Sequence, residues 1–170
     1  MKKTATVGLM MVLTGCIASQ HGVAQIKGTA AGSKLSGTAI FTQTSEGLKA
    51  SIQIAGAPRG VHAIHIHEKG DCSDSGKAAG SHFNPASAPH GFLPKDGAAH
   101  AHAGDMGNIT INENGSGSLE LMLPGLVLKE GPTAIDGRAV ILHEKPDDFS
   151  QPAGNAGSRI GCGVITVKQS

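Results

Sequence analysis

The sequence predicts an all-β domain: an eight-stranded Greek-key barrel or sandwich with two long functional loops. Three observations favour this class. Glycine contributes 25 of the 170 residues, whereas aromatic residues make up only 2%. Short segments of alternating apolar and polar residues are separated by turn residues. No long stretch shows helical periodicity. The length suits one domain with its own core.

The first 24 residues are expected to be a signal peptide and tether, which leaves 25–170 as the folded domain. Lys2 and Lys3 precede an apolar run through Leu13 that is too short for a permanent membrane helix. The run ends in Leu-Thr-Gly-Cys at Cys16, which resembles a bacterial lipoprotein signal with cleavage before Cys16 and lipidation of that cysteine. The alternative is ordinary cleavage after Ala24. Either way we expect export to the periplasm or cell envelope, and a lipid on Cys16 would anchor the chain to a membrane.

Eight segments are expected to be strands because they alternate and are bounded by turn residues. Closing them into a barrel would remove exposed sheet edges. In chain order they are Ala24–Ala30, Lys34–Thr42, Gly47–Ala55, Val61–Glu68, Met106–Ile111, Gly117–Met122, Ala139–His143 and Gly161–Val167.

Two long loops interrupt this pattern, at 69–104 and 144–158. The first is rich in Gly, Ser, Ala, Pro and His. A loop of this length inside a compact domain is either held by something or functional.

The composition argues against a nucleic-acid-binding function and draws attention to the histidines and cysteines. The formal net charge is +1 and there is no run of Lys or Arg, so no nucleic-acid partner is expected. There are nine histidines, and eight of them lie between His62 and His143. With Cys16 set aside, Cys72 and Cys162 remain, and an exported protein is expected to join them in a disulfide.

The fourth predicted strand carries a His-x-His pair. Residues two apart on a strand share a face, so His65 and His67 point one way, while Ile64 and Ile66 point into a core. Two such imidazoles can bind one metal ion, although a single pair is weak evidence. His62 shares the face of the isoleucines, so we interpret it as a packed, hydrogen-bonded structural histidine.

Further histidines and an aspartate, residue types that bind metals, lie in or beside the first loop and at the end of the seventh predicted strand. A tetrahedral set of three histidines and one aspartate fits zinc, whereas histidines alone fit copper that changes oxidation state. Metal binding would also order the first loop. The additional candidates are His82, His90, His102, Asp105 and His143.

Together these motifs resemble the copper–zinc superoxide dismutase family over nearly the whole mature chain. The matching segments are Gly60–Asp71, Gly80–Pro85, His90, His102–Asn108, His143–Asp148 and Gly154–Ile165. The resemblance implies one copper and one zinc ion per subunit. It implies copper ligands His65, His67, His82 and His143, and zinc ligands His82, His90, His102 and Asp105.

The resemblance also implies roles for other residues. His82 would bridge both metals as an imidazolate and take part in catalysis. Asp147 would link a copper-binding and a zinc-binding histidine through its carboxylate. Arg159 would be a catalytic residue that docks the anion above the copper channel. A bond between Cys72 and Cys162 would tie the loop of this arginine to the first long loop.

The implied reaction converts superoxide, the substrate, to dioxygen and hydrogen peroxide by Cu(II)/Cu(I) cycling, and would protect the cell envelope. The alternative is an exported copper or zinc storage protein, or a copper-delivery protein, on the same scaffold. A zinc hydrolase is disfavoured because the zinc would already have four protein ligands. A homodimer is left open, because family members pair through different surfaces or stay monomeric.

Some positions have competing interpretations. His100 could compete for zinc, but His102 is preferred because it has the family spacing His-x-x-Asp. His21 is expected to lie outside the domain. The second loop carries few charges, and Ala153 stands where relatives often have threonine, so superoxide steering would be weaker or would come from lysines such as Lys69, Lys77 or Lys95.

Overall fold

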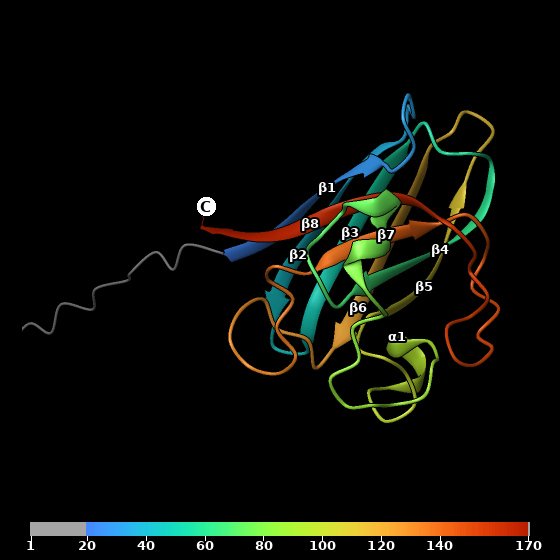
Figure 1. Cartoon of the computed structure of the whole chain (residues 1–170). Coiled ribbons are helices and arrows are strands. Elements are labelled where there is room, and N and C mark those ends of the chain that lie inside the picture. Colours follow the sequence, from blue (N-terminus) through green and yellow to red (C-terminus); the bar gives the residue numbers. More distant parts are fainter. Residues whose placement is uncertain (1–19, 170) are drawn as a thin grey trace, which may run out of the picture.

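The computed structural model describes residues 20–169, in which eight antiparallel strands form one sheet that curls into a nearly closed barrel (Figure 1). The strand order is β5-β4-β7-β8-β1-β2-β3-β6, and the end strands β5 and β6 also contact each other. The predicted fold class is confirmed. The strands are β1 (Gln20–Gly28), β2 (Ser36–Thr44), β3 (Gly47–Ala55), β4 (Gly60–His67), β5 (Asp105–Ile111), β6 (Gly117–Pro124), β7 (Ala139–His143) and β8 (Arg159–Gln169).

Strand β1 begins earlier than the sequence pattern indicates. Gln20 pairs with Gln169 of β8, and His21 pairs with Thr42 of β2. The Nδ1 atom of His21 also lies 3.2 Å from Thr42 Oγ1. The prediction that His21 lies outside the domain is therefore wrong. Backbone pairing with two neighbouring strands extends the ladder over residues whose side chains give no apolar alternation.

Strands β4 and β7 are buried on both faces, which positions the candidate site. Ile64, Ile66 and Leu142 belong to the main hydrophobic core inside the barrel. Residues of opposite parity on the same strands, including His65 and His143, are also buried although they face out of the barrel. The long loops must therefore cover the outer face of these two strands, so a site there is enclosed between barrel wall and loops.

The first long loop contains two short helical segments, the kinked 3-10 segment η1 (Asp74–Ala79) and the single-turn helix α1 (Leu93–Asp96). Elements this short have no periodicity to reveal them in a sequence. The loop is fixed to the barrel by a Cys72–Cys162 disulfide, which joins it to β8 and confirms the predicted pairing. It is also fixed to β4, because the Phe83 amide donates to the Ile66 carbonyl at 2.8 Å. Within residues 20–169, no helix is long and apolar enough to cross a bilayer.

Candidate metal centre

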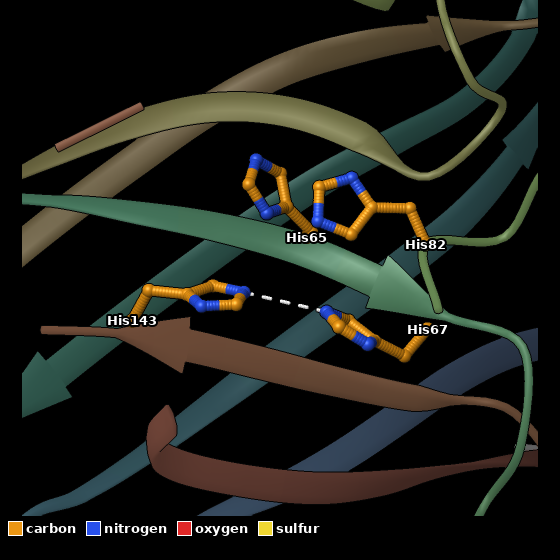
Figure 2. Close-up of side chains that lie close together, drawn as sticks. All are labelled: His65, His67, His82 and His143. Carbon is orange, nitrogen blue, oxygen red and sulfur yellow. Dashed lines mark hydrogen bonds between the residues drawn. The ribbon is translucent and has the colours of Figure 1, made fainter. Parts of the chain in front are cut away.

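Four histidines converge on the outer face of β4 and β7 (Figure 2). His65 and His67 come from β4, and His143 is the last residue of β7. His82 comes from the first loop and is held by a β-bridge to His67. Each ring offers one nitrogen within 4.8 Å of those of the others, and the Nε2 atoms of His67 and His143 are 3.3 Å apart. We call these four residues the histidine group.

Protein acceptors fix the ring orientations in this group. His65 Nε2 lies 2.8 Å from an oxygen of Asp147, and His67 Nδ1 lies 2.9 Å from the carbonyl oxygen of Gly80. Each ring therefore uses one nitrogen to donate a hydrogen bond outward. The other nitrogen, Nδ1 of His65 or Nε2 of His67, is left to face the centre of the group as a potential metal ligand.

A second cluster, which we call the mixed group, consists of His82, His90, His102 and Asp105. Asp105 Oδ1 lies 2.9 Å from His82 Nδ1 and 3.2 Å from His102 Nδ1, and its Oδ2 lies 2.9 Å from His90 Nδ1. Three imidazole nitrogens thus surround one fully buried carboxylate. This donor set matches tetrahedral zinc sites in number and chemistry.

His82 belongs to both groups. Its Nδ1 faces Asp105 of the mixed group. Its ring centroid lies 4.1 Å from that of His65 and 5.0 Å from that of His67, both in the histidine group. The two nitrogens of an imidazole flank one ring carbon and their lone pairs point in diverging directions, so His82 can offer one nitrogen to each group.

Asp147 connects the two groups by contacting the outward-facing nitrogens of one histidine in each. Its carboxylate lies 2.8 Å from His65 Nε2 and 2.9 Å from His90 Nε2. The backbone of Asp147 is fixed in turn by the Asn108 side chain, which accepts from the Asp147 amide at 2.7 Å and donates to its carbonyl at 3.0 Å. Because Asn108 is part of β5, the rigid barrel determines where this carboxylate lies.

Two buried nitrogens indicate that the residues fit metal ions. Among the described side chains, His65 Nδ1 is buried with no hydrogen-bond partner, and His90 Nδ1 lies 2.9 Å from Asp105 Oδ2 without the alignment of a hydrogen bond. One belongs to each group, and in both residues Asp147 engages the other nitrogen. A buried nitrogen without a well-aligned partner is costly, and coordination to an ion would satisfy both atoms.

His65, His67 and His143 are neutral near pH 7. Burial lowers the pKa of His65 to about 4 and that of His143 to about 3. Burial also lowers the pKa of His67. Neutral imidazole is the form that ligates metals, so these three side chains need not lose a proton to bind an ion at neutral pH.

Two buried carboxylates are ionised in and beside the mixed group. Burial alone would raise the pKa of Asp105, but its contacts with His102, His82 and His90 hold that pKa well below its usual range. Hydrogen bonds from His65 and His90 likewise outweigh burial and depress the pKa of Asp147. Burial disfavours the charged form of His90, but its contacts with Asp105 and Asp147 raise its pKa to about 9. Asp105 therefore places a negative charge among the histidines of the mixed group, and Asp147 places a second one behind His65 and His90.

A hollow of about 650 Å³ opens onto the histidine group. One water molecule occupies about 30 Å³ in the liquid, so the hollow has room for a small hydrated anion. Arg159, the first residue of β8, is the one Lys, Arg, Asp or Glu residue among its described lining residues. Its guanidinium donates to the carbonyl oxygens of Gly76 at 2.6 Å and Gly80 at 2.5 Å. The hollow is lined by His67, Ser81, His82, Asn84, His102, His143, Pro152, Ala153, Asn155, Ala156, Gly157 and Arg159.

The remaining histidines of the central region lie outside both groups. His62 is buried, with Nδ1 2.9 Å from the His143 carbonyl oxygen and Nε2 2.9 Å from that of Pro58, which confirms its predicted structural role. His100 is exposed, and the structure places His102 rather than His100 in the mixed group. Cys16, the predicted lipidation site, lies outside the described residues.

A β-barrel that carries two adjoining groups of buried histidines and a carboxylate on its outer face defines a metal-binding barrel protein. The chain belongs to the copper/zinc superoxide dismutase family, whose model, described as copper/zinc superoxide dismutase (SODC), matches residues 35–165. Among solved structures, the crystal structure of the clock protein EA4 is similar, with 37% identity and a TM-score of 0.75. The match covers 92% of this chain and 99% of that chain. The family that the sequence resembles is confirmed.

Sequence reasoning missed three residues that hold the site in place: Asn108, Gln151 and Gly154. Asn108 fixes the backbone of Asp147, and Gln151 contacts the backbone of His90. Gly154 packs against Asp147 and His90 where a Cβ atom would collide with both. No sequence signal reveals these contacts, because each joins segments that are remote in the chain or depends on the absence of a side chain.

Proposed function

We propose that this protein is an enzyme that converts superoxide to dioxygen and hydrogen peroxide, with one copper and one zinc ion per chain. The observation that carries the proposal is that His82 is shared between the histidine group and the mixed group. A shared imidazole couples two unlike sites, which a simple storage site does not need. Copper would be held by His65, His67, His82 and His143, and zinc by His82, His90, His102 and Asp105.

Apart from the chemistry of the ions, three residues would have separate roles in this reaction: Arg159, His82 and Asp147. A bound copper ion would supply one-electron exchange with superoxide, and zinc would supply a fixed positive charge. Arg159 would attract the anion into the hollow and hold it beside the histidine group. His82 lines the hollow with Nδ1 turned to Asp105, so its Nε2 is the atom suited to deliver a proton to the nascent peroxide. Asp147 would keep His65 and His90 correctly oriented.

The test is to purify the mature domain, measure its copper and zinc content, and follow superoxide consumption before and after chelation. We expect one copper and one zinc per chain, with activity that is lost on chelation and restored by both ions. His82→Ala should abolish activity and lower retention of both metals. His100→Ala is the matched control, because His100 is exposed and belongs to neither group. Bound copper without activity would favour the storage or copper-delivery alternative.

We also propose that the chain is exported, cleaved before Cys16 and lipidated on that residue. The Cys72–Cys162 disulfide supports an oxidising compartment. The position of β1 supports the cleavage site, because cleavage after Ala24 would remove residues that pair with both β2 and β8. Mass spectrometry of the mature N-terminus tests this: a lipidated Cys16 is expected, and an unmodified Gln25 would contradict it.

A further inference from the structure

We propose that Gln151 is a positioning residue that holds His90 in place for zinc. The inference rests on the proposed function in one respect, namely that the mixed group binds zinc. It concerns a residue of the second loop that touches neither the histidine group nor, through its side chain, the hollow.

His90 is the member of the mixed group with the least backbone support of its own. It lies in irregular chain between η1 and α1. By contrast, Asp105 begins β5, and His82 is bridged to β4 through His67. The His102 amide donates to the Asp105 carboxylate at 2.9 Å. A buried backbone needs partners for both its N–H and its C=O, and no strand supplies them to His90.

The Gln151 side chain supplies both partners. Its Oε1 accepts a hydrogen bond from the His90 amide at 2.9 Å, and its Nε2 donates to the His90 carbonyl at 2.8 Å. This is the reciprocal pattern that a neighbouring strand would provide, made here by one amide group. It reaches across 61 positions of sequence. A primary amide is suited to the task because it is the neutral group with a donor and an acceptor side by side.

The same short segment also contacts the His90 ring. Asp147 binds Nε2 at 2.9 Å, and the Phe149 ring lies nearly parallel to the imidazole, 19° from its plane with centroids 6.5 Å apart. The second loop thus engages the backbone, the ring edge and the ring face of His90. The orientation of its Nδ1 toward the mixed group depends on this loop.

The consequence differs between the two groups. His65, His67 and His143 are fixed on strands, so their positions do not depend on Gln151. His90 does depend on it, so loss of the amide is expected to let His90 rotate out of the mixed group. Residues that orient metal ligands commonly change metal affinity by about 10–100-fold when replaced. We therefore expect Gln151 to control zinc retention while copper retention is unaffected.

The experiment compares zinc release from the metal-loaded protein to a chromogenic chelator. Gln151→Met removes both hydrogen bonds at nearly constant length, and Gln151→Glu keeps an acceptor for the His90 amide but loses the donor. Gln53→Met is the matched control, because Gln53 is an exposed glutamine on β3 remote from both groups. We expect zinc release at least about tenfold faster in Gln151→Met, intermediate release in Gln151→Glu, and wild-type release in the control. Copper release should be the same in all four proteins.

Two further readouts separate positioning from general stabilisation. Cobalt(II) in place of zinc should give a visible spectrum that changes in Gln151→Met and not in Gln53→Met, because the spectrum reports ligand geometry. Urea unfolding of the metal-free variants should show that Gln151→Met still folds cooperatively, with a modest loss of stability from the two unpaired backbone groups of His90. Wild-type zinc release and spectrum in Gln151→Met would overturn the proposal while leaving the proposed function intact, as would equal loss of copper and zinc. Failure of the wild-type protein to bind zinc would overturn both.

Discussion

At the scale of single residues, the site depends on which nitrogen of each histidine is turned outward. Asp147 engages Nε2 of His65 and Nε2 of His90, so the Nδ1 atoms of both rings face the groups where ions would bind. One carboxylate thereby orients one histidine in each group. Because the pKa of Asp147 is depressed by these bonds, it stays ionised and keeps both rings oriented across the neutral pH range.

Arg159 gives the first prediction. Arg159→Ala is expected to lower the rate of superoxide consumption roughly tenfold at low salt, because the one permanent positive charge in the hollow is lost. Copper content should not change, since the guanidinium bonds to backbone carbonyls and not to the histidine group. Activity at low and high ionic strength, with copper analysis, checks this. Full activity of Arg159→Ala at low salt would show that Arg159 does not dock the anion.

Gly154 gives the second prediction. A Cβ atom at this position would lie 1.8 Å from Asp147 Oδ1 and 2.8 Å from His90 Nε2. Gly154→Ala should therefore displace the carboxylate that joins both groups and weaken retention of both metals by roughly tenfold or more. The measurement is competition with a chelator for each metal.

The matched control for this substitution is Gly32→Ala. Gly154 has φ +70 and Gly32 has φ +75, but a Cβ atom at Gly32 would meet nothing within 4 Å. Both substitutions carry the same backbone strain, so their difference isolates the collision with Asp147. Equal metal retention in the two variants would mean that Asp147 can shift without effect on the site.

At the scale of the elements, the strands could be predicted and the loop contacts could not. Alternation predicted β3, and a short apolar run predicted β7, at the bounds that the structure has, because β3 buries mainly one face and β7 buries both. The start of β1 was missed because Gln20 and His21 join the sheet through backbone pairing, which leaves no apolar pattern. The members of the histidine group and the mixed group were predictable from their motifs. Gln151 and Asn108 were not, because their partners are backbone atoms of distant segments.

The disulfide between the first loop and β8 gives the third prediction. The two cysteines are 90 residues apart, so a chain-entropy argument assigns the bond about 4–5 kcal/mol of stability. A Cys72→Ser, Cys162→Ser double variant should lose most of this in urea unfolding. It should also loosen the carbonyl contacts of Arg159, because Cys162 lies three residues after Arg159 on β8. Activity should then fall more than copper content.

A reducing agent provides the control for this prediction. Wild-type protein with its disulfide reduced should unfold at nearly the urea concentration of the double variant, and the variant itself should not respond to reductant. If the double variant is as stable as the oxidised protein, the first loop is held by its backbone contacts with β4 and not by the bond.

At the scale of the whole molecule, the two groups impose opposite pH dependences on the metal-free fold. His65, His67 and His143 have lowered pKa values, so the unfolded chain, with histidines near 6.5, binds more protons than the folded one. Stability from these groups is present above about pH 6.5 and is lost as the pH falls. His90 has a raised pKa of about 9, so its contribution is present below about pH 6.5 and is lost as the pH rises through 9.

The fourth prediction follows from the difference in proton number. On the acid side three histidines act together, so the free energy of unfolding should fall by up to about 4 kcal/mol per pH unit below pH 6. On the alkaline side only His90 acts, so the free energy of unfolding should fall by about 1.4 kcal/mol per pH unit. The metal-free domain should therefore be most stable near pH 7, where the folded and unfolded chains bind equal numbers of protons at these four histidines, and should lose stability more steeply toward pH 5 than toward pH 9. Urea unfolding at pH 5, 7 and 8.5 measures both limbs. His143→Gln should reduce the number of protons taken up on acid unfolding by about one and leave the alkaline limb unchanged. Equal slopes of the unfolding free energy on both sides in the wild-type protein would contradict these histidine pKa shifts.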